Sequence, residues 1–420
     1  MGRIDKKQKA RRLKQALIDI DNNKVVNRRD DLVENNKGYR MFVIGAGFSV
    51  PAGLPMASEL FSEVRSRIEM NYGIETRFHR SLAEYIDYRK KCDGVDLAPE
   101  DVDLEAFMSY LDIEHFLGLE GSDTFSEHGN EAQLFVKRYI GQVIHERTPK
   151  QDELPAEYYE FAEQLSVHDI VITLNYDVIL ERALEHIGKP YRLFPNRYSQ
   201  IYEHSSTVDS SIEEVTILKL HGSLDWFSDK LFQYGVRSFA KQGVKGAPND
   251  PIFNNNNRYG HYPLVDGPRR GDDPLNNIYR LKNIDAFYSF GDPPSVPMIL
   301  SPSHMKIVYA NPFLDFWYGI GQSGGYNLGL NIIGFSLPEH DDYIRISLFK
   351  MVENYQSVCW DDRLLDSLKD NVKVVDYRTC EAGKADLRSR YSFIDEEKSE
   401  FYTDGFSSKA VEFLFKNSRT

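Results

Sequence analysis

Two short polar stretches follow apolar runs in a pattern that could support proton transfer and hydrogen bonding to a ligand. The stretch TLNYD places Thr173, Asn175 and Asp177 at alternate positions, so they share one side of the chain if it stays extended. The stretch KLHGS ends a second apolar run with His221, whose imidazole titrates near neutral pH and can accept a proton. These residues also have structural uses, as caps, Asx turns or a packed histidine. Asn175 and His221 are our candidate catalytic residues, and Thr173 and Asp177 are candidate binding residues.

A third candidate is the turn GAGFSVPAGLP, residues 45–55, which directly follows the apolar run MFVI. Glycine lets the backbone approach a ligand closely because it has no Cβ atom, and N–H groups at helix starts attract anions such as a pyrophosphate. The spacing matches neither a P-loop nor a strict GxGxxG motif, so a purely structural turn stays open. The candidate binding residues in this turn are Gly45, Ala46, Gly47, Ser49, Gly53 and Pro55.

These stretches lie at the ends of predicted strands, and the intervening elements define the fold class. Runs typical of buried strands are MFVI (41–44), DIVITLNYD (169–177), VTILKLHGS (215–223), MILSP (298–302), LNIIGFS (330–336) and VKVVDY (372–377). Several are followed by amphipathic helical stretches, such as VILERALEHI and YIRISLFKMVENY. This alternation predicts an α/β fold with a Rossmann-like, doubly wound parallel sheet, in which ligands bind where strands end and helices begin.

Segments of different character interrupt this alternation and predict the domain organisation. Residues 56–166 contain several amphipathic helical stretches, which indicate a helical insertion too long for a single crossover helix. Residues 229–297 are rich in Asn, Gly, Pro and charge, which predicts a polar surface loop or lid. The remaining predicted units are a basic helical extension at 1–40, a sheet domain at 41–55 and 167–380, and a helical tail at 381–420 whose closing helix is capped by Ser407 or Ser408.

Composition limits the class of protein. The chain has 420 residues, of which 41% are hydrophobic, and a formal net charge of −13, so we expect a globular protein that does not bind nucleic acid over a broad surface. No apolar run approaches the about 20 residues of a membrane span, and a cytoplasmic protein is expected. Cys92, Cys359 and Cys380 lie far apart, which predicts neither a disulfide framework nor a zinc site.

The ordered segments together resemble the sirtuin superfamily and, more closely, the bacterial sirtuin-like proteins of antiphage defence. The segments that carry the resemblance are GAGFSVPAGLP, DLEAFMSYL, TLNYDVILERAL, LKLHGSLDW, ILSPSHMK and IIGFSLPEHD. They run from about Phe42 to Asp342, and that group also has a helical insertion and a long polar segment in these places. Deacetylase sirtuins differ, because they usually carry Phe-Arg after the glycine-proline turn and hold zinc with two Cys-x-x-Cys pairs, whereas this chain continues MASELF and has no cysteine between Cys92 and Cys359.

The resemblance implies that NAD is the substrate and assigns a role to each candidate residue. The glycine turn would hold the pyrophosphate through main-chain N–H groups, and Asn175 would position ribose hydroxyls or the attacking water. Asp177 would accept a hydrogen bond from the nicotinamide carboxamide. His221 would act as the general base. Gly334 and Ser336 would contact the adenosine ribose and phosphate.

The resemblance also implies an activity and partners. Since the zinc cysteines are missing, we expect hydrolysis of NAD to nicotinamide and ADP-ribose, without a metal, in place of deacylation. The implied setting is antiphage defence by NAD depletion in a homo-oligomeric assembly, with a HerA-type hexameric DNA-translocating ATPase as one partner and with nucleic acid contacted only indirectly. An NAD or ADP-ribose sensing module without turnover, a protein deacylase and an ADP-ribosyltransferase stay open as alternatives. Asp341 also fits the pattern but could simply cap the following helix.

Overall fold

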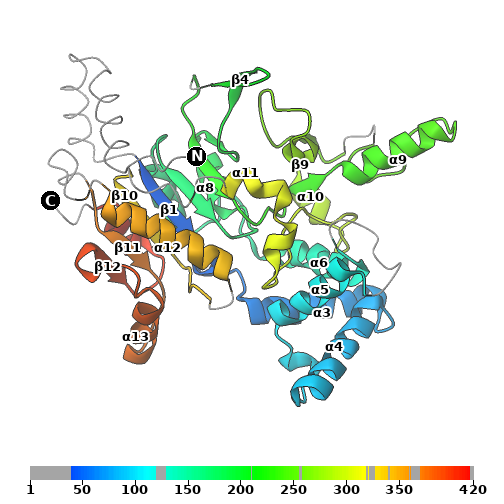
Figure 1. Ribbon diagram of the computed structural model, residues 1–420, viewed down its shortest axis with the longest axis horizontal. Coiled ribbons are helices and arrows are strands. Elements are labelled where there is room, and N and C mark those ends of the chain that lie inside the picture. The colour runs from blue at the N-terminus through cyan, green and yellow to red at the C-terminus, as the bar shows by residue number, and fades with distance from the viewer. Residues whose placement is uncertain are drawn as a thin grey trace.

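The computed structural model describes residues 39–119, 129–209, 211–254, 258–317, 320, 327–338, 341–358, 360 and 369–416. Within these residues, seven parallel strands form a central sheet in the order β12-β11-β10-β1-β2-β6-β3 (Figure 1). Its strands are β1 (Arg40–Ile44), β2 (Ile170–Thr173), β3 (Tyr191–Arg192), β6 (Val215–Lys219), β10 (Gly329–Ile333), β11 (Val372–Val375) and β12 (Ser399–Tyr402). This architecture confirms the predicted α/β, Rossmann-like fold.

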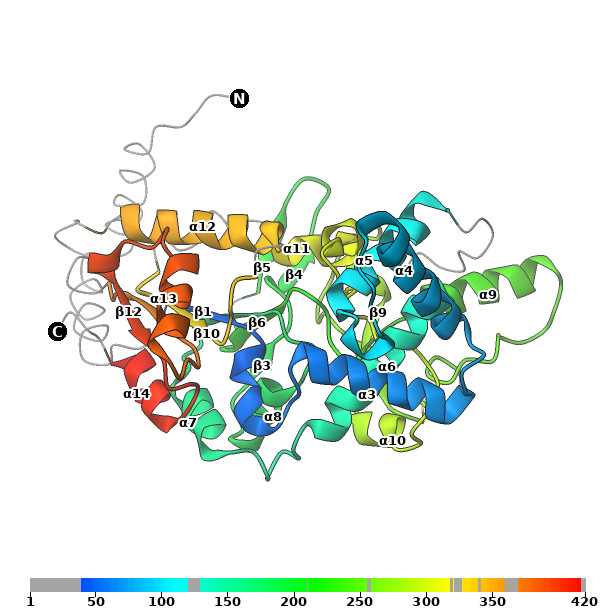
Figure 2. The ribbon, with the colours of Figure 1, turned by 90° about the horizontal axis from the view of Figure 1, so that it is seen from below.

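Helices cover both faces of the sheet, as its uniformly apolar strands require. Every residue of β1, β6, β10 and β11 is buried, because each strand is packed on both sides. Figure 2 shows α12 along one face and α7, α8 and α14 along the other. The helices around the sheet are α7 (Ala156–Gln164), α8 (Ile179–His186), α11 (Leu314–Trp317), α12 (Asp342–Ser357), α13 (Glu381–Arg390) and α14 (Ser408–Phe415).

The strand order reverses direction at β1, and open parallel sheets bind ligands at the carboxyl ends of strands at such a position. The chain passes from β1 to β2 on one side, while β10 and β11 lie on the other. The register aligns the last residues of these strands, since Ile44 pairs with both Ile333 and Thr173, and Thr173 pairs with Lys219. The turns that follow β1, β2, β6 and β10 therefore emerge side by side, where parallel sheets bind ligands.

The helical insertion forms a second core. Its helices are α3 (Ala57–Tyr72), α4 (Arg77–Asp93), α5 (Leu104–Leu117) and α6 (Glu131–Arg147). The predicted insertion 56–166 also included α7, but Tyr158 and Phe161 of that helix pack in the core of the sheet. Fully buried Val64, Phe78 and Phe107 pack together in the second core. At the start of α6, Asn130 and Gln133 form a reciprocal capping box, which satisfies N–H groups that the first turn leaves unpaired.

The segment 229–297 is folded, so the prediction of a polar loop or lid does not describe it. It contains α9 (Lys230–Lys241), β8 (His261–Pro263), β9 (Ile278–Leu281) and α10 (Ile284–Tyr288), and β9 pairs antiparallel with both β8 and β7 (Trp226–Ser228). Tyr259, Phe287 and Tyr288 are buried in the same core as the helical insertion. A few widely spaced aromatic residues hold this segment in place, and a composition average conceals them.

Three smaller expectations can be compared with the structure, which differs from the first two and agrees with the third. MILSP is not a strand of the sheet, because it makes a single bridge from Ile299 to Gly222 and bonds instead to the turn after β6. The expected helical tail at 381–420 also contains a strand, β12, which forms one edge of the sheet. A separate short hairpin of β4 (Tyr198–Ile201) and β5 (Ser206–Val208) was not predicted. Ser407 caps α14 by accepting a bond from the Ala410 N–H, as expected. The predicted N-terminal helix lies outside the described residues.

Candidate functional site

Three predicted residues meet in one hydrogen-bonded cluster at the carboxyl ends of β1 and β2. The Asn175 Nδ2 donates to the Gly45 carbonyl and to the Ser49 Oγ, both at 3.0 Å. The Ser49 hydroxyl in turn donates to the Asp177 Oδ2 at 2.7 Å, and the other carboxylate oxygen accepts from the Ile179 N–H at 3.0 Å. Ser49 and Asp177 are buried, whereas Asn175 is half-buried. The cluster therefore fixes the Asn175 amide at the carboxyl end of the sheet, and Asp177 also accepts a bond at the start of α8, the structural use that the sequence left open.

The glycines of the turn allow close packing against the end of β10. A Cβ on Gly47 would lie 2.7 Å from the Gly334 Cα, and one on Gly45 would lie 2.7 Å from the Gly334 carbonyl oxygen. The N–H groups of Gly45 and Gly47 donate to the carbonyls of Ile333 and Gly334. Since these donors are already used inside the chain, the role assigned to them as pyrophosphate ligands needs correction.

The remaining turn residues follow the same pattern. The Ser49 N–H donates to the Ala46 carbonyl at 2.9 Å, which closes a single helical turn, so this donor is also engaged within the chain. Gly53 is exposed at a φ of 90° and ends the next turn, while Pro55 is half-buried just before α3. These contacts give the turn a structural role and leave ligand binding at Ala46, Gly53 and Pro55 as a prediction.

His221 is connected to Asn175 by a hydrogen bond to the backbone of the preceding residue, Leu174. Its Nδ1 is 3.0 Å from the Leu174 carbonyl, and because a carbonyl can only accept, Nδ1 carries the proton. The Nε2 lone pair then accepts from the Tyr343 hydroxyl at 2.8 Å. Gly222 frees the backbone behind the imidazole, since a Cβ there would lie 2.1 Å from the Met298 carbonyl oxygen. The structure thus brings the two candidate catalytic residues together and places a tyrosine on the basic nitrogen.

Burial keeps His221 neutral. The side chain is only 5% exposed, and this desolvation, with the nearby positive charge of Lys306, lowers the pKa of His221 to about 3. The hydrogen bond to the Leu174 carbonyl acts in the opposite direction. At neutral pH the imidazole is therefore an acceptor of hydrogen bonds and a weak base, which suits orientation of a hydroxyl or water better than full removal of its proton.

A buried lysine links the helical insertion to the start of α12 near this histidine. The Lys306 Nζ lies 3.2 Å from the Asp341 Oδ1 and 3.3 Å from the Glu105 Oε1 on α5. Lys306 and Asp341 are buried, while Glu105 is partly exposed. Asp341 precedes α12 but makes no capping bond with its side chain, so the ion pair replaces the cap that its position suggested.

A second buried ion pair lies beneath the cluster. The Lys219 Nζ is 2.8 Å from the Glu181 Oε1 and also donates to the Asp177 carbonyl. Both side chains are buried, and desolvation raises the pKa of Glu181. Thr173 completes this layer, because its hydroxyl accepts from the Asn175 N–H at 3.1 Å. The pair supports the strand tips from below.

The sequence did not predict the residues that surround His221. It did predict one site residue, Ser336, that lies outside the cluster. Ser336 is exposed, and none of its described contacts connects it to Asn175, whereas Gly334 packs directly on the glycine turn. Tyr343, Lys306 and Lys219 were not named as site residues. Lysine as the last residue of a strand that is otherwise apolar is a signal that could have drawn attention to Lys219. Nothing in the pattern around Tyr343 distinguishes it from an ordinary helix residue.

Part of the chain is similar to a known protein family. Residues 169–241 match the model of the SIR2-like domain, a range that includes β2, β6, Asn175 and His221 but not the glycine turn. This match and the parallel sheet show a Rossmann-like α/β protein with one segment similar to the SIR2-like domain. A search of curated proteins found no match.

Solved sirtuin structures cover most of the chain at low similarity. The structure of Sir2Tm bound to a propionylated peptide is 10% identical, with a TM-score of 0.29, and covers 89% of this chain and 91% of that one. A complex of Sir2 with a p53 peptide and NAD⁺ is 11% identical, with a TM-score of 0.27, over 89% and 91% of the two chains. A structure on sirtuin substrate affinity is 12% identical, with a TM-score of 0.32, over 92% and 96%. At this level, no property of the site is inferred from them.

Two searches of the described residues concern metals and membranes. No group of three or more His, Cys, Asp or Glu side chains in this part of the chain could hold a metal ion. None of its helices is both long and apolar enough to cross a membrane. The expectation that the chain works without zinc stays a prediction.

Proposed function

We propose that this chain is an NAD glycohydrolase that cleaves NAD to nicotinamide and ADP-ribose. The observation that carries the proposal is the contiguity of Asn175 and His221 at the strand switch point, with a neutral Nε2 facing a hydroxyl donor. The SIR2-like match over 169–241 supports it, because it contains both residues. The resemblance of the ordered segments to the sirtuin superfamily makes NAD the substrate to test first.

The residues suggest how the reaction would proceed. The bond between ribose C1′ and the nicotinamide nitrogen breaks, and its electron pair leaves with neutral nicotinamide, so positive charge develops at C1′. Asn175 would orient the ribose hydroxyls or the attacking water, whose oxygen bonds to C1′. His221 would accept a hydrogen bond from that hydroxyl or water through Nε2, and the released proton would pass to it or to solvent.

Substrate binding would require one local rearrangement. The Tyr343 hydroxyl occupies the position from which a ribose hydroxyl or water would donate to the His221 Nε2. The substrate must therefore displace this hydroxyl. The same contact favours one alternative, a module that binds NAD or ADP-ribose without turnover while the tyrosine stays in place.

The setting of this activity rests on the resemblance to antiphage proteins. Depletion of NAD would harm the cell that contains the enzyme, so activity would be restrained until infection. A homo-oligomer in the cytoplasm, joined by a HerA-type ATPase, is the assembly that the resemblance proposes for this restraint. A deacylase or ADP-ribosyltransferase would instead require an acceptor protein for turnover.

The test is to incubate the purified chain with NAD and to separate the products by chromatography. We expect nicotinamide and ADP-ribose in equal amounts, and a loss of about 10²- to 10⁴-fold in rate for His221→Ala. His145→Ala is the matched control, since His145 is a half-buried histidine of low pKa, stacked on Tyr288 of the other core. Bound NAD without product would support the sensing module, and equal losses in both variants would contradict the role of His221.

A further inference from the structure

Helix α9 projects from the body as an arm that its own chain does not bury. Figures 1 and 2 both show α9 extending away from the rest of the molecule at one end of the long axis. None of its residues is buried, and the outward Leu231 and Tyr234 are 64% and 69% exposed. Among the described residues, the opposite side packs on the return segment, where the Phe232 and Phe253 rings lie 6.1 Å apart and a Cβ on Gly235 would lie 2.5 Å from the Pro248 Cγ. An amphipathic helix with this exposure has an unpartnered face.

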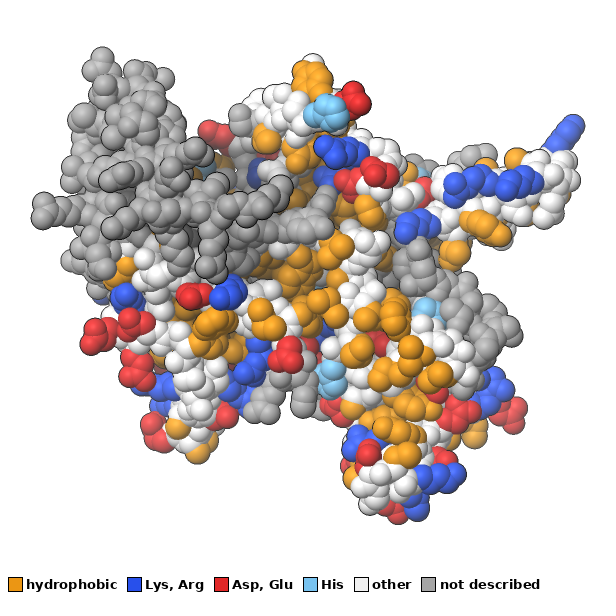
Figure 3. Space-filling model, in the orientation of Figure 1, with side chains coloured by type: hydrophobic (Ala, Val, Ile, Leu, Met, Phe, Trp, Pro, Cys, Tyr) orange, Lys and Arg blue, Asp and Glu red, His pale blue; other side chains and the backbone are white. Residues whose placement is uncertain are grey.

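The arm is basic in a strongly acidic protein. The stretch 230–249 contains Lys230, Arg237, Lys241 and Lys245 but no Asp or Glu, whereas the whole chain has a net charge of −13. Figure 3 shows blue side chains along one side of the arm and orange ones along the other. A partner for this face should therefore offer apolar contacts within an acidic rim.

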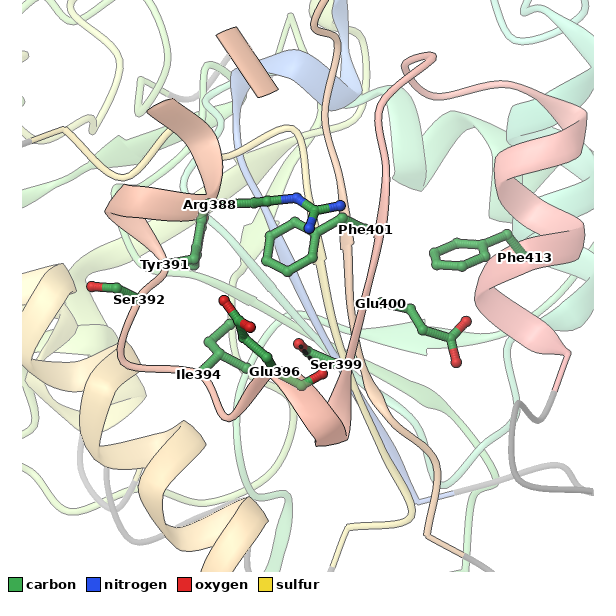
Figure 4. Close-up of a pocket in the computed structure, with 9 residues that line it drawn as sticks. All are labelled: Arg388, Tyr391, Ser392, Ile394, Glu396, Ser399, Glu400, Phe401 and Phe413. Atoms are coloured by element: carbon green, nitrogen blue, oxygen red, sulfur yellow. Dashed lines mark hydrogen bonds between the residues drawn. The ribbon is translucent and has the colours of Figure 1, made fainter. Parts of the chain in front are cut away.

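A groove with these properties lies at the other end of the same molecule. It has a volume of about 410 Å³ and runs along β12, which no strand pairs on its outer side within the described residues. Its apolar walls come from Phe401, Phe413 and Ile394. Figure 4 shows Arg388 over the ring of Phe401, and Glu400 on the side of the strand where Phe413 lies.

The rim of the groove is acidic. Its segment 394–400, IDEEKSE, carries four carboxylates and one ammonium group, and Arg388 adds one cation to the lining, so carboxylates remain in excess. Lys398 lies 3.6 Å from Asp395, so these two charges match each other and three carboxylates of the segment remain. Glu396 and Glu397 are exposed. Charge and apolar character therefore complement those of the α9 arm, which presents Leu231 and Tyr234 among basic side chains.

We infer that the α9 arm of one copy docks in the β12 groove of a second copy. Both figures place the two surfaces at opposite ends of the long axis, so an arm cannot reach the groove of its own chain. A contact between two different surfaces is heterologous, and it repeats into a closed ring or an open chain of copies. Tyr234 and Arg237 belong to residue types that anchor interfaces.

Two variants separate the partners of this contact. Leu231→Asp with Tyr234→Asp removes the arm's apolar contacts, and Glu396→Lys with Glu397→Lys reverses the rim, all at exposed positions. Sedimentation velocity of the full chain, without NAD, should show loss of at least tenfold in self-association for each, and a similar loss for the wild type in 0.5 M salt. Ile74→Asp with Tyr202→Asp is the control, because these side chains are exposed elsewhere, and it should associate like the wild type.

Mixing the two variants tests the geometry. The arm variant keeps an intact groove and the rim variant keeps an intact arm, so the mixture should form pairs and nothing larger. A carbodiimide should join Lys241 or Lys245 of an isotope-labelled copy to Glu396 or Glu397 of an unlabelled copy.

Four results would overturn the inference. The first is a wild type that is monomeric at all concentrations. The second is unchanged association of either variant. The third is a cross-link from the rim to a lysine of residues 1–38, which would place that segment in the groove. The fourth is loss of binding to anionic vesicles or duplex DNA by the arm variant with self-association intact, which would assign the arm to another partner. Since none of these measurements uses NAD, they stand apart from the proposed activity.

Discussion

The strand tips of the sheet and the segments that close over them hold the candidate site in different ways. Ser49, Asn175 and Asp177 bond to one another and to strand-end backbone, on a turn packed against Gly334 with no space for a Cβ. Tyr343, by contrast, reaches His221 from the first turn of α12 through one hydrogen bond. The base of the site is therefore held by several hydrogen bonds, whereas its cover is held at His221 by one, the bond that the proposed substrate would have to replace.

The largest expected effect comes from disturbing the rigid side. Gly334 has a φ of 62°, and a Cβ there would lie 2.2 Å from the Phe48 nitrogen and 2.4 Å from the Gly47 carbonyl carbon. Gly334→Ala combines backbone strain with overpacking, so it should lower the free energy of unfolding by about 3 kcal/mol or more. Thermal and urea unfolding would measure the loss.

Gly53→Ala is the matched control for that variant. Gly53 also has a positive φ, of 90°, but no atom lies within 4 Å of the added Cβ. It should cost only the backbone strain, about 1 kcal/mol. Equal destabilisation by the two substitutions would show that the close packing of the turn on Gly334 does not matter for stability.

The rigid side was also the part that the sequence predicted well. Apolar runs ending in Gly45, Thr173 and His221 identify parallel strands and their carboxyl ends, because strand geometry is local and repeats every two residues. Tyr343 and Lys306 could not be identified in this way. Their positions depend on how α12 and the residues after MILSP fold back over the sheet, which is a long-range property.

The segment 229–297 shows the same limit in the fold. Its polar composition indicated a loop, yet Tyr259, Leu281 and Phe287 are buried in the core of the helical insertion. Such residues are too few and too irregularly spaced to give a periodic signal. Their partners, such as Phe227, also lie far from them in the sequence.

A smaller effect should appear in the pH dependence of stability. The pKa of His221 is about 3 in the folded chain against an ordinary value of 6.5, so the unfolded state binds a proton more readily below pH 6.5. Stability should be unaffected by this group well above pH 6.5 and should fall by up to about 1.4 kcal/mol per pH unit below it, which is about 2 kcal/mol between pH 6.5 and 5. His145, with a pKa of about 4, adds a loss of the same sign.

Unfolding measured between pH 6.5 and 5 in His221→Gln would isolate this contribution. The slope of unfolding free energy against pH should decrease by up to about 1.4 kcal/mol per pH unit, the value for one bound proton, relative to the wild type. His204→Gln is the control, because His204 is exposed, and it should leave the slope unchanged. An unchanged slope in His221→Gln would mean that the histidine is more solvated than its 5% exposure implies.

The smallest expected effect tests whether the cover moves. Removing the Tyr343 hydroxyl frees the His221 Nε2 and spares the substrate the loss of a hydrogen bond worth about 0.5 to 1.5 kcal/mol. Tyr343→Phe should therefore raise kcat/KM for NAD by about two- to tenfold, chiefly through a lower KM. Steady-state kinetics of nicotinamide release would measure it.

Tyr355→Phe on the same helix gives the comparison that decides between gating and catalysis. Its hydroxyl donates to the carbonyls of Leu328 and Asp370, away from His221, so its loss should weaken the fold without raising kcat/KM. If Tyr343→Phe instead lowers kcat while Tyr355→Phe does not, the Tyr343 hydroxyl takes part in the reaction as a donor. The segment over the strand tips would then belong to the rigid part of the site, because its contact with His221 would have to persist during turnover.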